Sequence, residues 1–234
     1  MNRKPIIGVV ARSFYEEDKS FIKLNDDYRL AIINSGGIPF IIIPTDNQCY
    51  ATTSPSDANR LSEEDKKDIY DILSKCDGIL ITGGSRWFEF DEIVCKYALD
   101  NNIPILGICL GMQLLGNIDN FDGGRNSDRT VKNNTEIDHC QEDISYVHEC
   151  NINKGLLHDI LGVDKLKVNS RHNYHINEKD YFNIDAYSED GLIEAIHIPG
   201  YKFALGVQWH PENMIKYDNN MHKIFDAFIN ATKK

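Results

Sequence analysis

The chain contains the stretch Pro104-Ile-Leu-Gly-Ile-Cys-Leu-Gly-Met-Gln-Leu-Leu-Gly116, in which an apolar run leads directly into a helix-like segment. Gly107 and Gly111 flank Cys109 at two residues on either side, the spacing of a strand–turn–helix elbow. Such a sharp turn strains the central residue and presses neighbouring backbones together, so small residues are needed beside it. The pattern predicts a strand over 103–108, a helix over 110–118 and Cys109 at the carboxyl end of the strand.

That position would suit a reactive cysteine. The helix dipole and the unpaired N–H groups at a helix N-terminus favour a thiolate, which is the attacking form of cysteine. Free cysteine is also among the most buried residue types, and Gly-x-Cys-x-Gly arises often by chance. The motif alone therefore leaves two interpretations of Cys109 open, a nucleophile and an inert structural thiol.

Apolar runs alternate with helix-like segments through the first half of the chain. Asn25 is a predicted N-cap, and Ser62 opens a predicted capping box. Strands are expected over 6–10, 39–43, 78–82 and 103–108, and helices over 25–35, 62–75, 91–101 and 110–118. Strands that are apolar throughout and alternate with helices imply a parallel sheet covered on both faces.

The second half has shorter strand candidates after a polar, irregular segment over 121–140. Strands are expected over 145–152, 167–169, 182–188, 192–198 and 203–208, with a hairpin turn at Asp190-Gly191 and a final helix over 219–232. We therefore predict one α/β domain over 1–234. Its fold is a three-layer, flavodoxin-like, mostly parallel central sheet with helices on both faces and a few extra antiparallel strands in the C-terminal half.

Composition and charge exclude several functions. The 234 residues carry a net charge of −11, which argues against non-specific nucleic-acid binding. An anionic substrate would need local positive charge to offset this field. No apolar run reaches the ~18 residues that a bilayer requires. The N-terminal apolar run is a strand rather than a signal peptide, so a cytoplasmic location without membrane partners is expected.

The six cysteines form no Cys-x-x-Cys pair and are expected to be free thiols. His139-Cys140 and His148-Glu-Cys150 match the ligand spacing of no familiar zinc site. The sequence therefore predicts neither a metal nor a cofactor.

A candidate base follows the strand over 203–208. His210 and Glu212 are two residues apart, and residues two apart share a face in extended backbone. An imidazole oriented by a carboxylate is the base that a nucleophilic thiol needs. His-x-Glu is common, and His210 is equally compatible with an ordinary loop histidine. It is preferred over His172, His175 and His222 because it follows a strand end, as Cys109 does.

Together these segments resemble the class I glutamine amidotransferase superfamily and, within it, the γ-glutamyl-γ-aminobutyrate hydrolase type (peptidase family C26). The resemblance covers nearly the whole chain. It is carried by Pro5-Ile-Ile-Gly-Val9, Asp77-Gly-Ile-Leu-Ile-Thr-Gly-Gly84, the elbow segment, Val168-Asn-Ser-Arg-His172, Asp190-Gly-Leu-Ile-Glu-Ala195 and Gly206-Val-Gln-Trp-His-Pro-Glu212.

The resemblance implies hydrolysis of a γ-glutamyl amide in a small-molecule substrate, through a thioester, with release of glutamate. It implies catalytic roles for Cys109, His210 and Glu212. It also implies an oxyanion hole made by the backbone N–H groups of Gly84 and Leu110, and substrate contacts from Gln113, Ser170 and His172.

The chain departs from the family pattern at two loops. Gly83-Gly84 continues as Ser-Arg-Trp-Phe-Glu-Phe-Asp91, without the family's aspartate and proline, and a second family motif is replaced by Gly123-Gly-Arg-Asn-Ser-Asp128. Both loops are expected to border the leaving-group side of the site, so the leaving amine stays open. The expected contacts to it are Arg86, Trp87 and Arg125.

Two alternatives remain. The chain could be a glutaminase subunit that supplies ammonia to a separate synthetase, or a non-catalytic binding module on the same fold. The complete Cys-His-Glu set favours an enzyme. A homodimer is expected only because dimers are the commonest oligomers.

Overall fold

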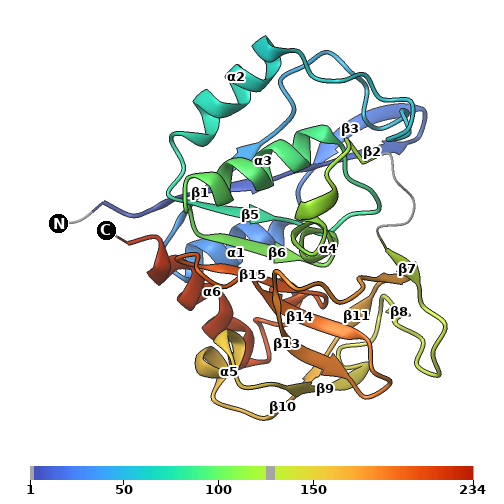
Figure 1. Ribbon diagram of the computed structural model, residues 1–234, viewed down its shortest axis with the longest axis vertical. Helices are drawn as coiled ribbons and strands as arrows, with labels where there is room; N and C mark the ends of the chain where they lie inside the picture. The colour runs from blue at the N-terminus through green and yellow to red at the C-terminus, as the bar shows by residue number, and fades with distance from the viewer. Residues whose placement is uncertain (1–2, 125–129, 234) are drawn as a thin grey trace.

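A nine-stranded sheet runs through both halves of the chain (Figure 1). The computed structural model describes residues 3–124 and 130–233. From one edge to the other, the strands are β10 (Lys165–Val168), β9 (His148–Ile152), β13 (Asn183–Ser188), β14 (Ile193–His197), β15 (Ala204–Val207), β6 (Ile105–Ile108), β5 (Gly78–Ile81), β1 (Ile6–Val10) and β4 (Ile38–Ile42).

The sheet changes character at β15. All pairings from β4 to β15 are parallel, and those from β15 to β10 are antiparallel. In the parallel part, Ile108 at the end of β6 lies beside Val207 at the end of β15. The segments that follow these two strands therefore emerge side by side, at the edge where α/β sheets bind ligands.

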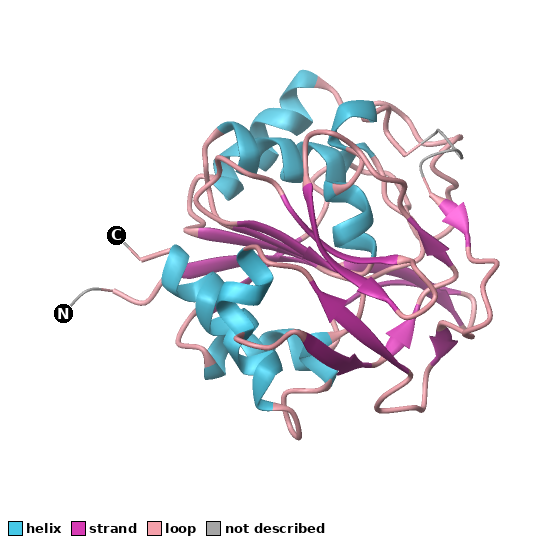
Figure 2. Cartoon of the chain, turned by 60° about the horizontal axis from the view of Figure 1, so that its bottom comes forward, coloured by secondary structure: helices cyan, strands magenta, loops and turns pink. Residues whose placement is uncertain are grey.

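Helices cover both faces of the sheet (Figure 2). One face packs against α1 (Asp26–Asn34), α5 (Leu156–Leu161) and α6 (Asn219–Ala231). The other packs against α2 (Glu63–Leu73), α3 (Glu89–Asp100) and α4 (Leu110–Leu115). Each face has its own buried apolar cluster, which is why the strands between them are apolar on both sides. The predicted fold class is confirmed.

Local signals located several elements correctly. The Asn25 side chain caps α1, and Ser62 and Asp65 form the predicted capping box of α2. Gly191, at φ +89°, lies in the predicted turn between the antiparallel strands β13 and β14. All six cysteines are free.

A hairpin at 12–23 was missed. Its strands are β2 (Arg12–Glu16) and β3 (Lys19–Lys23), joined by Glu17 and Asp18, which both have positive φ. A two-residue turn of this type normally uses asparagine and glycine, so the sequence carried no turn signal here.

Other elements differ in extent or were not predicted. The helix after Cys109 ends at Leu115 rather than 118, and the 3₁₀ turn η1 (Ile118–Asn120) follows it. Strand β6 begins at Ile105 rather than 103, and β9 begins at His148 rather than 145. Helix α5 is only six residues long, which is too short for a periodic pattern to reveal it.

Short strands complete the described fold. They are β7 (Val131–Lys132), β8 (Cys140–Gln141), β11 (Ser170–Arg171) and β12 (Tyr174–His175), and the 3₁₀ turn η3 (Pro211–Asn213) follows β15. Strand β11 pairs with β8, and β12 pairs with β7, so the irregular segment before β9 is held against residues 170–175. No helix in the described ranges is long and apolar enough to cross a membrane.

We predict that Gly111→Ala destabilises the protein by about 2 kcal/mol or more, because the added methyl would lie 2.2 Å from the Ile81 carbonyl oxygen. Urea unfolding measures the change. Gly116→Ala is the matched control. Its methyl would come closest to a side-chain atom, Ile176 Cδ1 at 2.4 Å, rather than to backbone, so the loss should be smaller. Equal losses in the two variants would contradict the proposed backbone constraint.

Candidate active site

Cys109 lies in a strained turn between β6 and α4. Its backbone has φ +53° and ψ −104°, a conformation that non-glycine residues seldom adopt. A methyl at Gly107 would lie 2.5 Å from the Gly111 carbonyl group, which shows how closely the two segments approach. The glycines at 107 and 111 therefore permit the turn that presents the Cys109 side chain at the end of the sheet, as the elbow pattern predicts.

His210 follows β15 and is held from two sides. Its Nδ1 lies 2.7 Å from Glu212 Oε1, and the Glu212 side chain is almost completely buried. Asn169 accepts a hydrogen bond from the His210 N–H at 2.8 Å and donates one to the His210 carbonyl oxygen at 2.9 Å. Because Nδ1 faces a carboxylate, Nε2 is the nitrogen left to act on a neighbouring thiol.

The side chains of Cys109 and His210 lie side by side, since a methyl at Gly83 would be 3.5 Å from Cys109 Cβ and 2.7 Å from His210 Cε1. Burial alone would raise the pKa of the Cys109 thiol, but its interaction with His210 outweighs burial and lowers this pKa. Burial would lower the pKa of His210, but Glu212 and Cys109 outweigh it and raise this pKa. Both shifts favour a thiolate–imidazolium pair near neutral pH.

Backbone N–H groups lie beside this pair. The Gly83 N–H donates to the Tyr28 hydroxyl at 3.0 Å, and that hydroxyl lies 3.5 Å from His210 Nδ1. Gly84 lies against the Leu110 side chain and lines the same pocket as Cys109. Leu110 is the first residue of α4, so its N–H has no acceptor within the helix.

Sequence reasoning missed Arg12, which organises the loop after β5. Its guanidinium forms an ion pair with the buried carboxylate of Asp91. It also donates to the carbonyl oxygens of Thr82 and Gly83, at 2.8 and 3.1 Å. Arg12 thus fixes the segment that precedes Gly84. It lies on the missed hairpin, and a lone arginine carries no motif that would have marked it.

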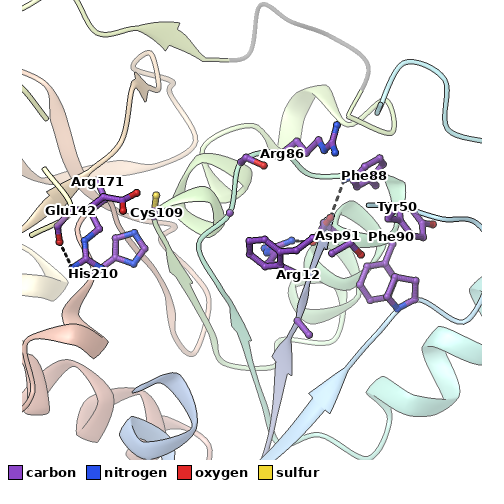
Figure 3. Close-up of a pocket in the computed structure, with 16 residues that line it drawn as sticks. Arg12, Tyr50, Arg86, Phe88, Phe90, Asp91, Cys109, Glu142, Arg171 and His210 are labelled. Carbon is purple, nitrogen blue, oxygen red and sulfur yellow. Dashed lines mark hydrogen bonds and ion pairs between the residues drawn. The ribbon is translucent and has the colours of Figure 1, made fainter. Parts of the chain in front are cut away.

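A pocket of about 310 Å³ opens beside Cys109 (Figure 3). Cys109, His210 and Arg171 lie at one end of it in this view, and Phe88, Tyr50 and Phe90 lie at the other. Phe14 and Arg86 also line it. Three arginines and two acidic residues, Asp91 and Glu142, line the pocket, and Arg12 is paired with Asp91, so the lining is slightly positive in a chain with a net charge of −11.

Three predicted substrate contacts lie outside this pocket. The Gln113 amide nitrogen donates to the Tyr174 carbonyl oxygen at 2.9 Å and to Gln208 Oε1 at 3.2 Å. Ser170 and His172 are buried. Their side chains join a polar cluster with His139, His148 and Glu194. That cluster is the group of described side chains with the composition and spacing to hold a metal ion.

Of the three predicted leaving-group contacts, one lines the pocket, one is buried and one lies outside the described residues. Arg86 lines the pocket and donates to the Ala51 carbonyl oxygen at 3.1 Å. Trp87 is buried and donates through its indole N–H to Glu92 Oε1 at 3.1 Å, so its ring packs in the interior. Arg125 lies outside the described residues.

The fold and the arrangement around Cys109 define a class I glutamine amidotransferase type of domain. The Peptidase C26 family matches residues 88–212, more than half of the chain, and the chain belongs to this family. The resemblance expected from the sequence is confirmed. Membership supports, at the level of reaction class, hydrolysis of a glutamine-type amide.

Curated relatives include the CTP synthases of Staphylococcus aureus strains NCTC 8325 and JH9. Each is 32% identical to this chain over 200 residues, a match that covers 74% of this chain and 37% of the relative. The match thus spans little more than a third of the length of these relatives.

Two solved structures share the fold. The glutaminase domain of Trypanosoma brucei CTPS with bound acivicin has a TM-score of 0.64 and 19% identity, with 98% of this chain and 94% of that chain covered. The second, from Thermoplasma acidophilum, is a putative GMP synthase subunit. It has a TM-score of 0.63 and 18% identity, with 99% of this chain and 96% of that chain covered.

We predict that His210→Asn raises the pKa of the Cys109 thiol, because burial then acts without the opposing imidazolium. Alkylation of Cys109 by iodoacetamide at neutral pH should slow by about tenfold or more, and its pH profile should move to higher pH. Mass spectrometry of the Cys109 peptide measures the rate.

Exposed Cys49 is the internal reference in the same sample. Hydrogen bonding, chiefly with Ser20, lowers the pKa of Cys49 to about 7. Its alkylation should not change in His210→Asn, and His222→Asn on α6 should change neither rate. An unchanged Cys109 profile in His210→Asn would show that the two side chains are not electrostatically coupled.

Proposed function

We propose that this chain is a cysteine-dependent hydrolase of γ-glutamyl amides that works through a γ-glutamyl thioester. One observation carries the proposal. Cys109 stands in a strained turn at a pocket, beside His210, whose ring is in turn held by Glu212 at 2.7 Å. A nucleophile, a base and an orienting carboxylate in this order form a catalytic triad.

In the proposed mechanism, the Cys109 thiolate attacks the γ-carbonyl carbon of the substrate. The negative charge that develops on the carbonyl oxygen is stabilised by the N–H groups of Gly84 and Leu110. The His210 imidazolium gives its proton to the departing amine, and the thioester forms. Neutral His210 then takes a proton from water, which attacks the thioester. Glutamate leaves, and the proton restores the thiolate–imidazolium pair.

The two ends of the pocket suggest which part of the substrate lies where. We place the γ-glutamyl group beside Cys109 and Arg171, where positive charge can hold its carboxylate. The aromatic end, with Tyr50, Phe88 and Phe90, then receives the amine. An amine with an apolar or aromatic substituent fits this end better than ammonia does. In this arrangement, Gln113, Ser170 and His172 lie behind the residues that line the pocket and hold them in place.

A second candidate function is supply of ammonia from glutamine to a separate synthetase. The 32% identity to CTP synthases favours it, because the match covers only part of those proteins. A glutaminase subunit of this kind would require a protein partner, whereas the hydrolase would act alone.

We expect the isolated protein to release glutamate from γ-glutamyl amines, and Cys109→Ala to lose this activity by about 10⁴-fold or more. A short incubation with substrate followed by acid quench should leave a γ-glutamyl adduct on the Cys109 peptide. Cys95→Ala, which alters a buried thiol away from the pocket, is the control and should retain activity.

The substrate panel separates the alternatives. Glutamine turnover that appears only after a synthetase is added would favour the ammonia-supplying subunit over the hydrolase. Turnover that is unchanged in Cys109→Ala would rule out the proposed nucleophile. The absence of both turnover and adduct with every γ-glutamyl compound would favour a binding module.

We predict that Phe14→Ala lowers kcat/KM about fivefold for γ-glutamyl amines with apolar substituents and leaves that for glutamine nearly unchanged. Phe14 lines the pocket and is 48% exposed, so its loss removes a substrate contact rather than core packing. Phe21→Ala is the matched control, because Phe21 pairs with Phe14 across the hairpin but does not line the pocket. Equal effects on both substrates would place the amine elsewhere.

A further inference from the structure

Four buried polar side chains converge behind the active site. His139 precedes β8, His148 is in β9, His172 follows β11, and Glu194 is in β14. All four side chains are 0% or 1% exposed. One potential ligand atom from each lies within 4.8 Å of the other three. None of the four lines the pocket beside Cys109.

One oxygen of Glu194 lies close to a ring nitrogen of each histidine. Glu194 Oε1 lies 3.3 Å from His172 Nε2, 3.6 Å from His139 Nδ1 and 3.7 Å from His148 Nε2. Ligands bound to zinc at ~2.0–2.1 Å in a tetrahedron are about 3.3 Å apart. The three spacings from Glu194 Oε1 are within a few tenths of an ångström of such edges, and all four ligand atoms, which lie within 4.8 Å of one another, would move closer together around an ion.

Each histidine turns one ring nitrogen toward this centre and the other away from it. The outer ring nitrogens face acceptors: Asp190 Oδ2 lies 3.0 Å from His139 Nε2, the Glu149 carbonyl oxygen 3.4 Å from His148 Nδ1, and the Tyr174 carbonyl oxygen 3.1 Å from His172 Nδ1. Carbonyl and carboxylate oxygens only accept, so these contacts favour a proton on the outer nitrogen, while the Asn133 amide nitrogen also lies 3.3 Å from His172 Nδ1. The same outer contacts orient histidine ligands in metal sites.

Without a cation, the centre would be electrostatically unfavourable. Within the described residues, both Glu194 oxygens and the inner nitrogens of His148 and His172 have no hydrogen-bond partner. Buried lone pairs would then face a buried carboxylate with nothing between them.

A single added proton would not give all of these buried atoms a hydrogen-bond partner. A proton on His172 Nε2 would point toward Glu194 Oε1, which lies 3.3 Å away. His148 Nε2 and Glu194 Oε2 would therefore still lack partners. A metal ion would bind the inner nitrogens and the carboxylate together.

We propose that His139, His148, His172 and Glu194 form a buried zinc site. Three imidazoles and one carboxylate form a ligand set that zinc accepts, and four protein ligands leave no open position, as in structural rather than catalytic sites. The charges of Glu194 and neighbouring Asp190 balance the two charges of the ion. Zinc at this position differs from the expectation of no metal, because the ligands come from four separate segments and share no sequence spacing.

The site would hold together segments that support the catalytic base. Ser170 Oγ lies 3.1 Å from His139 Nδ1, and Asn169, the residue before it, clamps His210 on both sides. Zinc would therefore anchor the segment before β8 to the strands β9 and β14 behind residues 169–172. The inference does not rest on the proposed activity.

The test is zinc binding to the whole chain after removal of metal with a chelator. It is done in Cys109→Ser, so that the active-site thiolate cannot act as a ligand. We expect about one zinc per chain by elemental analysis, a tetrahedral visible spectrum with Co²⁺, and a higher Tm with zinc. X-ray absorption of the zinc form should show nitrogen and oxygen ligands without sulfur.

Variants locate the ion. Glu194→Gln keeps the side-chain shape, and His148→Asn removes one ring, so each should weaken zinc binding by at least about tenfold and abolish the zinc-dependent rise in Tm. His158→Asn on the surface helix α5 is the control and should bind zinc normally.

Three results would overturn the proposal: no stoichiometric zinc in the Cys109→Ser chain, sulfur among the ligands, or undiminished zinc affinity in Glu194→Gln. The ligand spectrum of the Cys109→Ser chain decides the question even where a ligand variant fails to fold. Because none of these readouts uses turnover, their outcome is independent of whether γ-glutamyl amides are substrates.

Discussion

The close approach of three backbone segments at Gly107, Gly111 and Ile81 is the constraint on which the site depends. A methyl group at Gly111 would lie only 2.2 Å from the Ile81 carbonyl oxygen, so α4 starts almost in contact with β5. This crowding forces Cys109 into a positive φ and directs its thiol beyond the end of the sheet. It also brings the Leu110 side chain against Gly84.

Burial strengthens the electrostatic interactions of the Cys109–His210 pair. Glu212 is 2% exposed and lies on the Nδ1 side of His210, so its charge acts on the ring with little screening by water. Asn169 fixes the backbone of His210 through two hydrogen bonds and thereby the direction of the ring. The thiolate–imidazolium pair depends on both contacts, because an imidazolium that turned away would leave a buried thiol with a raised pKa.

Much of the fold could be predicted because its signals are local. Continuous apolar runs marked β1, β5 and β6, and capping residues such as Ser62 marked helix starts. The hairpin over 12–23 could not be predicted, because Glu17 and Asp18 adopt a turn that their side chains disfavour. That hairpin carries Arg12 and Phe14, so part of the pocket wall was missed with it.

The motifs around Cys109 and His210 include the strands that precede them, so the local sequence was enough to place both residues at strand ends. The pairing of β6 with β15, and the choice of which side chains face the pocket and which face the interior, came from the folded arrangement. Ser170 and His172 turn inward because the segment before β8 packs against β11 and carries His139 to them. His148 and Glu194 reach the same place from β9 and β14. Long-range strand pairing brings these side chains together, and the spacing of residues along the chain does not predict that pairing.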